Sequence, residues 1–383
     1  MTNTAGIERF RIDIPQADVD DLRERLARTR WPSDIAGAGW SRGVPVDYLK
    51  DLVEYWRTTF DWRAQEAKLN AFDQYTTEID GHDIHFVHVR SPEPNAMPLM
   101  ITHGWPGSVV EFMEIVGPLT DPGRYGGDPA DAFHVIAPSI PGFGFSGPTR
   151  EEGWNVQRIA TAWAELMRRL GYERYVVQGG DFGSQISREL SLVDRDHVAA
   201  IHVNGGFTLP FEVDEAEVAA LPERDQERMA YLYGYDIAYT AIQAAKPQTL
   251  AYGLTDSPVG QAAWIVEKFK EWSDPAKDLP EDAVDIDQLL TNVSVYWFTG
   301  TAGSSAQIYR ESANGWGAEP EVSDVPAGVA LFTTRDVALR HVDERKNNIV
   351  HWSDYDRGGH FAAMEAPDLL IDDVREFFRV FRK

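Results

Sequence analysis

The order of the expected strands and helices places the chain in the α/β class, with a mostly parallel twisted sheet flanked by helices. Between about residues 76 and 208, strand patterns and helix patterns alternate, which is typical of such a sheet. The alternation then stops, a long helical stretch follows, and strand patterns return near residue 329. The sequence therefore predicts an α/β core that is interrupted by an inserted helical cap and preceded by a helical N-terminal extension.

The N-terminal extension, residues 1–75, is predicted to be helical because its apolar residues recur at helical spacing. Val19, Leu22 and Leu26 lie at positions i, i+3 and i+7. This helix should end by Trp31-Pro32, because the residue before a proline disfavours the helical conformation. A second helix is expected over residues 48–60. We expect the extension to pack on both the core and the cap.

Short apolar runs predict the strands of the core, which is assigned to residues 76–208 and 322–383. Runs without alternation, such as 133–137, suit a sheet that is buried on both faces. The helical cap takes residues 209–321. The expected core strands are 84–89, 99–102, 133–137, 175–177, 198–203, 329–332 and 348–352, and the expected core helices are 109–119, 156–170, 182–190 and 367–380.

The composition excludes several classes of protein. The 383 residues are 43% hydrophobic and 25% charged, which suffices for a large buried core. Lys and Arg number 36 against 61 Asp and Glu, and the resulting net charge of −25 disfavours binding to nucleic acid or to an anionic membrane. The absence of cysteine excludes disulfide scaffolds, cysteine-ligated zinc and thiol catalysis.

The chain shows no targeting or membrane-spanning pattern. Its first fifteen residues lack the apolar segment of a signal peptide, and no run approaches the ~18 apolar residues of a membrane span. We therefore expect a soluble protein of the cytoplasm without a membrane partner. The sequence leaves the oligomeric state open, with a homodimer as one option.

The strongest local motif is Gly179-Gly-Asp181-Phe182-Gly183, which follows an expected strand and opens an expected helix. This is the pattern of the nucleophile elbow of an α/β-hydrolase, in which a tight strand-to-helix turn presents the central side chain to a cleft. The central residue here is aspartate in place of serine. The alternative is a plain strand-end turn with Asp181 as a helix N-cap.

A second motif, His103-Gly-Trp105-Pro-Gly-Ser108, also joins an expected strand to an expected helix. In the α/β-hydrolase fold this loop supplies one backbone N–H of the oxyanion hole, and the residue after the nucleophile supplies the other. The two donors would be Trp105 and Phe182. The alternative is a tight Gly/Pro turn with no chemical role.

A third motif, Arg357-Gly-Gly-His360, lies on a glycine-rich loop after the last expected strand, where the general base of this fold sits. The order nucleophile, acid, histidine also fits the fold. We assign the acid to Asp336, just past the strand 329–332. His360, oriented by Asp336, would then activate water.

Together these motifs resemble the epoxide hydrolases of the microsomal type, within the α/β-hydrolase superfamily. The resemblance extends over nearly the whole chain. The segments that carry it are RFRIDIPQADVDDLRERLARTRWP, HGWPGS, GGDFGS, IQAAKPQTLAYGLTDSPVG, YWFTGTAGSSAQIYRES and RGGHFAAMEAP. It implies that Asp181 is the nucleophile, that His360 is the base and that Trp105 lies in the oxyanion loop.

The resemblance also implies two tyrosines in the cap, Tyr239 and Tyr309, that hold the epoxide oxygen. One departure concerns the acid. The family usually has Phe-Pro-x-Asp or Phe-Pro-x-Glu, whereas this chain has Phe332-Thr-Thr-Arg-Asp336, without the proline and with the acid one place later. The membrane anchor of some family members is not found in this sequence. The cap also contains competing tyrosines: Tyr231, Tyr233, Tyr235, Tyr252 and Tyr296.

The chemistry of these residue types agrees with the resemblance. An aspartate is ionised at neutral pH and attacks a strained carbon without help from a base, giving an alkyl ester. A protonated tyrosine donates to the leaving oxygen, and two donors share the developing charge. The expected substrate is a small apolar or aromatic epoxide, and the co-substrate is water. The sequence leaves open which epoxide is the substrate, which of its carbons is attacked and which enantiomer is preferred. It also leaves open whether the role is detoxifying or biosynthetic.

Two other functions compete. A haloalkane dehalogenase also uses an aspartate in this fold, but it commonly has tryptophan after the nucleophile, where this chain has Phe182. A non-enzymatic member of the fold should have lost the nucleophile or the base, and both are present. Diol formation, halide release or neither would separate the three.

We expect no cofactor and no metal. Residues 142–147 spell G-x-G-x-x-G, but Pro141 and Pro148 flank them and no helix is expected there, so a dinucleotide site is disfavoured. His82, His85 and His88 would point to alternating faces of a strand, which suits one metal ion poorly.

Overall fold

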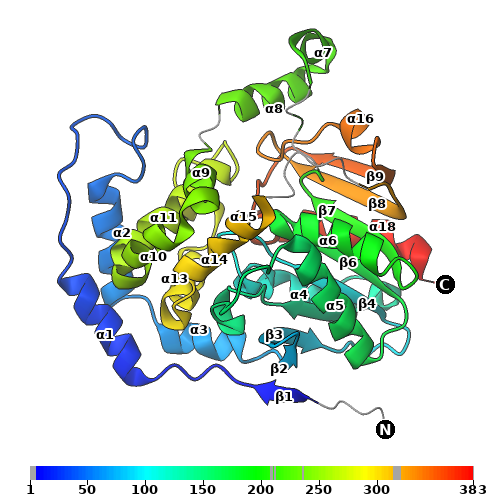
Figure 1. Cartoon of the computed structure of the whole chain (residues 1–383), viewed down its shortest axis with the longest axis horizontal. Helices are drawn as coiled ribbons and strands as arrows, with labels where there is room; N and C mark the ends of the chain where they lie inside the picture. Colours follow the sequence, from blue (N-terminus) through cyan, green and yellow to red (C-terminus); the bar gives the residue numbers. More distant parts are fainter. Residues whose placement is uncertain (1–5, 208–209, 211–212, 235–236, 314–320, 383) are drawn as a thin grey trace.

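A nine-stranded sheet runs through the computed structural model, which describes residues 6–207, 210, 213–234, 237–313 and 321–382 (Figure 1). Its strand order is β1-β2-β3-β5-β4-β6-β7-β8-β9. The pairs β1–β2, β2–β3 and β3–β5 are antiparallel, and all the others are parallel, so the predicted fold class is confirmed. The strands are β1 (Ile7–Phe10), β2 (Gln74–Ile79), β3 (His82–Val89), β4 (Met97–Thr102), β5 (Phe133–Pro138), β6 (Tyr175–Gly180), β7 (Val198–Asn204), β8 (Ser323–Phe332) and β9 (Asn347–Tyr355).

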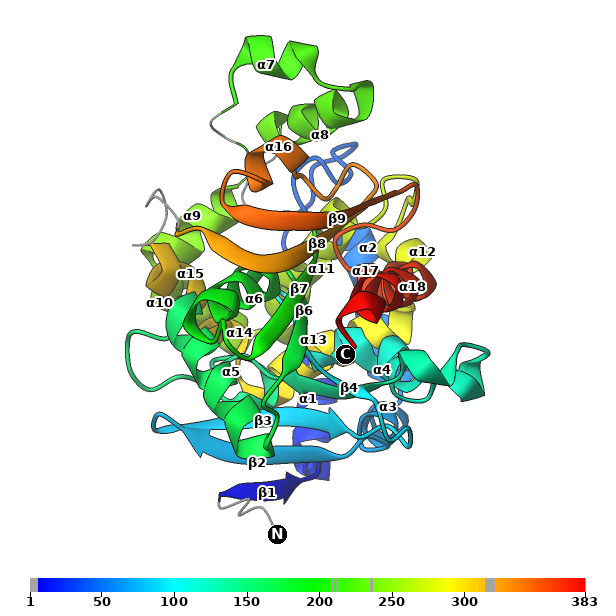
Figure 2. The same cartoon turned by 90° about the vertical axis from the view of Figure 1, so that its right-hand side faces the viewer.

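Helices cover both faces of this sheet. Helices α5 (Val156–Leu170) and α6 (Phe182–Val193) pack together on one face, and α4 (Met113–Thr120) and α18 (Pro367–Phe378) pack together on the other (Figure 2). Because the central strands are enclosed by both layers, their side chains are buried almost without alternation. Short elements complete the core: η1 (Val109–Phe112), η2 (Pro122–Tyr125), η3 (Pro129–Asp131), η4 (Gly144–Ser146), α16 (Arg340–Asp343), α17 (Ala362–Glu365) and η6 (Arg379–Phe381).

The N-terminal extension contains helices α1 (Gln16–Ala27), α2 (Val46–Thr58) and α3 (Trp62–Leu69). It also contains a strand, which corrects the prediction of an entirely helical extension. Ile7–Phe10 form β1 and pair with β2 at the edge of the sheet, in register Ile7 to Thr77. A four-residue strand has too little pattern of its own to be recognised, because its conformation is set by the partner strand.

Helices α1–α3 lie against the cap: α1 and α2 contact α11, which Figure 1 shows beside α2, and α3 contacts α13. The indole Nε1–H of Trp56 donates to Ser294 Oγ at 3.0 Å, and this hydrogen bond is buried. The hydroxyl of Tyr55 donates to Asp287 Oδ1 at 3.0 Å. Both acceptors lie on the cap helix α13 (Ile286–Thr299), so the extension holds that helix in place.

The cap helices fall into two groups (Figure 1). Most of them lie together over the sheet: α9 (Ala238–Ala245), α10 (Pro247–Asp256), α11 (Pro258–Trp272), α12 (Pro280–Ala283), α13, α14 (Ala302–Ser305) and α15 (Gln307–Ser312). Helices α7 (Glu215–Ala220) and α8 (Glu223–Gly234) stand apart from them. Met229 and Leu232 of α8 form a small apolar cluster with Val337 and Leu339, which follow β8. This pair of helices therefore packs on the core.

Over the described ranges, no helix combines the length and apolar character needed to cross a bilayer.

Candidate active site

Asp181 occupies the turn between β6 and α6, as the elbow motif predicts. Its backbone has φ 53° and ψ −125°, a left-handed conformation that costs free energy for any residue with a side chain. Such strain is typical of functional sites. The hydroxyl of Ser184 donates to the Asp181 carbonyl at 2.7 Å and closes the turn from the helix side.

The glycines around Asp181 allow three backbone segments to come together. A β-carbon on Gly183 would lie 2.0 Å from the Thr102 carbonyl oxygen, and one on Gly179 would lie 2.3 Å from the Gly183 carbonyl oxygen. A β-carbon on Gly104 would lie 2.3 Å from Asp181 Cβ. Any side chain at these positions would force the elbow away from the neighbouring loop.

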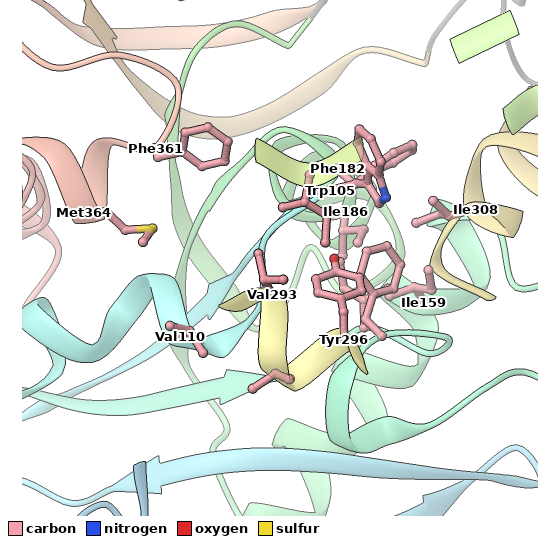
Figure 3. Close-up of a cluster of buried hydrophobic side chains, with 14 of the residues drawn as sticks. Trp105, Val110, Ile159, Phe182, Ile186, Val293, Tyr296, Ile308, Phe361 and Met364 are labelled. Atoms are coloured by element: carbon pink, nitrogen blue, oxygen red, sulfur yellow. The ribbon is translucent and has the colours of Figure 1, made fainter. Parts of the chain in front are cut away.

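The Trp105 loop follows β4, the neighbour of β6 in the sheet, so it meets the elbow at the carboxyl ends of the strands. The backbone N–H of Trp105 donates to Asp181 Oδ1 at 2.9 Å. Among the hydrogen bonds of the described residues, none joins the Phe182 N–H to this carboxylate. The structure therefore brings one of the two predicted oxyanion donors to Asp181. Figure 3 shows the side chains of Trp105 and Phe182 within one buried apolar cluster.

Buried polar contacts fix this loop from below and from the cap. Burial lowers the pKa of His103 to about 4, so its ring is neutral. Its Nε2 accepts a hydrogen bond from the Ile140 N–H, and its Nδ1 forms a hydrogen bond with the Gly104 carbonyl. From helix α13, the amide of Asn292 donates to the Pro106 carbonyl at 2.8 Å. The hydroxyl of Tyr296 donates to the Gly107 carbonyl at 2.6 Å.

His360 lies on the loop after β9, opposite Asp181. Its Nε2 is 3.8 Å from Asp181 Oδ2, too far for a direct hydrogen bond. Its backbone N–H donates to the Trp272 carbonyl at 2.9 Å, and its ring packs edge-on against Trp272. Burial lowers the pKa of His360, while the Asp181 carboxylate acts in the opposite direction. The imidazole is thus biased toward its neutral form.

Asp336 is buried just beyond the end of β8, beside the end of β7. Its Oδ2 accepts the Phe332 N–H at 3.0 Å, and Oδ1 lies 3.6 Å from the place of a β-carbon on Gly205. Burial raises the pKa of Asp336 to about 7, against the lowering effect of the Phe332 N–H. The hydrogen bonds of the described residues include none between Asp336 and His360. The structure thus leaves the predicted pair unconnected.

The two predicted cap tyrosines meet above the elbow. The ring of Tyr239, on α9, stacks on Trp105 with centroids 5.4 Å apart, and Tyr309, on α15, contacts Trp105 edge-on at 5.7 Å. The two tyrosine rings are 5.9 Å apart, and Tyr309 also lies 4.8 Å from Phe182. Two cap helices that are distant in the sequence but in contact in the structure therefore place one tyrosine each against the residues beside Asp181.

The competing tyrosines lie elsewhere. Tyr296 of helix α13 supports the Trp105 loop through the Gly107 carbonyl, and the hydroxyl of Tyr231 donates to the Glu271 carbonyl at 3.4 Å. Tyr233 and Tyr252 are exposed, with relative accessibilities of 56% and 73%. Tyr235 lies outside the described residues.

A small cavity opens between the elbow and the His360 loop. It has ≈ 10 Å³ of room for the centre of a water molecule, which is about what one buried water needs. Asp181, His360, Trp105 and Asn204 line it, together with Glu111, a residue that the sequence analysis did not single out. A signal was present, since Glu111 is an acid within the apolar run Val109–Phe112.

The described residues contain no cluster of three or more His, Cys, Asp and Glu side chains that could hold a metal ion. His85 illustrates this, because its two ring nitrogens are bound to Ser139 Oγ and Gln74 Oε1, each at 2.9 Å.

The mostly parallel sheet and the strand-to-helix turn with an acidic residue at its centre define an α/β-hydrolase fold with aspartate at the centre of the elbow. Family models agree: the model of the α/β-hydrolase fold matches residues 97–241, and that of the epoxide hydrolase N terminus matches residues 7–112. The chain belongs to the epoxide hydrolase family, and it is an enzyme of that class.

The relatives span nearly the whole chain. A protein of Stigmatella aurantiaca assigned as an epoxide hydrolase is 45% identical over 98% of this chain and 86% of its own length. Epoxide hydrolase 1 of Sus scrofa is 35% identical over 97% of this chain and 88% of its own. The solved structure of the Aspergillus niger epoxide hydrolase has a TM-score of 0.86 at 31% identity and covers 99% of this chain and 97% of its own.

Gly104→Ala tests the close approach at the elbow. The added β-carbon would overlap Asp181 and push the Trp105 N–H away from the carboxylate, so activity on an epoxide such as styrene oxide should fall by about 10²-fold or more. Gly253→Ala is the matched control, because a β-carbon there meets nothing within 4 Å. Full activity in Gly104→Ala would contradict the need for this contact.

Proposed function

We propose that this enzyme opens an epoxide to a vicinal diol in two steps, through a covalent ester on Asp181. The observation that carries the proposal is the position of the Asp181 carboxylate: Oδ1 accepts the Trp105 N–H, and Oδ2 faces His360. Oδ2 is therefore the oxygen that attacks the substrate carbon. Oδ1 becomes the carbonyl oxygen of the ester, already placed on its N–H donor.

In the first step, the bond between Oδ2 and the substrate carbon forms as the C–O bond of the epoxide breaks. The leaving oxygen takes a proton from Tyr239 or Tyr309, whose rings both pack against Trp105 and against each other. Two donors share the negative charge that develops on this oxygen. The aromatic walls formed by Trp105, Trp272 and the two tyrosines favour a small apolar or aromatic substrate.

In the second step, His360 removes a proton from water, and the water oxygen bonds to the carbonyl carbon of the Asp181 ester. The charge on Oδ1 is held by the Trp105 N–H, joined by the Phe182 N–H as the carbonyl carbon becomes tetrahedral. The intermediate collapses with loss of the diol oxygen, which takes the proton from His360. The acid proton left on Asp181 returns to the tyrosinate.

Asp336 orients His360 in this scheme and supports its positive charge. Burial disfavours the carboxylate form of Asp336, so an imidazolium nearby would stabilise it strongly. The pair would thus form when His360 takes the proton from water. Water and the epoxide are the only reactants, and neither a metal nor a cofactor enters the scheme.

The covalent intermediate predicts where solvent oxygen goes. In one turnover in ¹⁸O water with enzyme in excess, the label should appear in the peptide that contains Asp181 and not in the diol. His360→Gln should leave attack intact and add the mass of the substrate to the same peptide. Labelled diol on the first turnover and no adduct would exclude Asp181 as nucleophile. Halide release from haloalkanes without diol formation from epoxides would favour a dehalogenase.

The cap tyrosines predict a loss of ring opening. Tyr239→Phe or Tyr309→Phe alone should slow formation of the ester by about 10²–10³-fold, the usual cost of one donor to a developing oxyanion. The double variant should nearly abolish it. Stopped-flow measurement of ester formation checks this, with Tyr252→Phe as an exposed control. A double variant within tenfold of the wild type would rule out the role.

Asp336→Asn should slow hydrolysis of the ester by about 10²-fold while formation of the ester changes little, because an imidazolium arises only in the second step. Quenched-flow mass spectrometry should then show the ester accumulating. Asp324→Asn is the control, since Asp324 is exposed near the start of β8. Normal turnover in Asp336→Asn would transfer the role to another acid, and Asp343, which is buried and accepts the Phe207 N–H, would be tested next.

A further inference from the structure

Glu111 is an acid in the active-site cavity to which the scheme above gives no role. It lies on η1, directly after the Trp105 loop, and lines the same cavity as Asp181 and His360. Its carboxyl group lies against Gly107, because a β-carbon on Gly107 would come within 1.5 Å of Glu111 Oε1. The absence of a side chain at Gly107 thus makes room for this carboxyl group.

A comparison with Glu365 separates Glu111 from an ordinary buried acid. Burial is the main cause that raises the pKa of each to about 8. The carboxylate of Glu365 accepts the Phe361 N–H at 3.0 Å and the Asp274 N–H at 2.7 Å, so it ties two loops together. In the described part of the chain, the carboxyl group of Glu111 makes no hydrogen bond to protein. Its oxygens face a cavity with space for about one water molecule.

The position of Glu111 is fixed by the same contacts that fix the Trp105 loop. Ser108 caps η1 by accepting the Val110 N–H, and its hydroxyl donates to Asn292 on the cap helix α13 at 2.7 Å. Acidic residues in the first turn of a helix often serve only to balance the helix dipole. Glu114, in the first turn of the following helix α4, is exposed and fits that description, whereas Glu111 of η1 turns into the cavity beside another acid.

We propose that Glu111 is a further catalytic residue, which holds and orients the water molecule that attacks the Asp181 ester. This inference rests on the proposed function. One O–H of the water points to His360, which takes that proton, and the other donates to the Glu111 carboxylate. The water oxygen then bonds to the carbonyl carbon of Asp181, and the electron pair of the carbonyl bond moves to Oδ1. Glu111 itself gains and loses no bond.

The electrostatics of the cavity suit this role. Burial is the larger cause that raises the pKa of Glu111, and the negative charge of Asp181 is a second cause that raises it further. In the ester Asp181 has no charge, so the second cause is absent. Glu111 therefore ionises more readily in the intermediate, which is the state in which an acceptor for the water is needed.

Glu111→Gln tests the inference by single-turnover kinetics with mass spectrometry of the Asp181 peptide. The variant keeps the size of the side chain but cannot become a carboxylate. Formation of the ester should stay within a few-fold of the wild type, whereas its hydrolysis should slow by about 10²-fold, the usual cost of a misplaced reactant. The ester should accumulate, as in His360→Gln. Glu114→Gln is the matched control and should hydrolyse its ester at the wild-type rate.

A second variant covers the case in which Glu111→Gln does not fold. Gly107→Ala leaves Glu111 unchanged but places a β-carbon where its carboxyl oxygen lies, so the same selective slowing of hydrolysis is expected. Equal slowing of both steps, or hydrolysis at the wild-type rate, would overturn the inference. When the Glu111 and Gly107 variants give such a contradicting result, His360→Gln shows which claim fails. Without an ester in His360→Gln, the proposed function itself fails; with an ester in His360→Gln, only the inference about Glu111 fails.

Discussion

The close approach of backbone segments at Asp181 is the constraint on which the rest of the active site depends. Gly104 meets the side chain of Asp181, and Gly183 meets the carbonyl of Thr102, at distances that admit no β-carbon. These contacts bring the turn after β6 against the loop after β4, so that the Trp105 N–H reaches the carboxylate. Because the elbow is held from both sides, Asp181 keeps a backbone conformation that it would not adopt in isolation.

The same constraint links the site to parts of the chain that are far from it in sequence. The Trp105 loop is held from the cap by Asn292 and Tyr296 of helix α13. That helix is held in turn by the N-terminal extension, through the buried hydrogen bond from Trp56 to Ser294. The extension therefore does more than cover the cap. It fixes the helix against which the Trp105 loop is set, and this gives a physical reason for such a region to accompany the core.

The sequence predicted most of the core and the centre of the site, because both leave strong local patterns. Helix α5 has the predicted bounds, since its apolar stripe is complete and glycine follows its last residue. The strand β1 was missed because only its partner gives it a strand conformation. Among the tyrosines, periodicity alone could not select Tyr239 and Tyr309, whose rings meet through the packing of two separate helices. Glu111 was missed for a similar reason, as only the fold places its carboxyl group against Gly107.

The two steps of the proposed reaction make opposite demands on the charge of one small cavity. Attack on the epoxide needs a negative Asp181 with few other charges beside it, and burial provides this by raising the pKa of Glu111 and Asp336 and by lowering that of His360. Hydrolysis of the ester needs a negative environment around a developing imidazolium. Once the ester has removed the charge of Asp181, nearby acids ionise at lower cost and can supply that environment. The formation of the intermediate would thus change the electrostatics of the cavity without any movement of the chain, and a rigid, closely packed elbow is compatible with both steps.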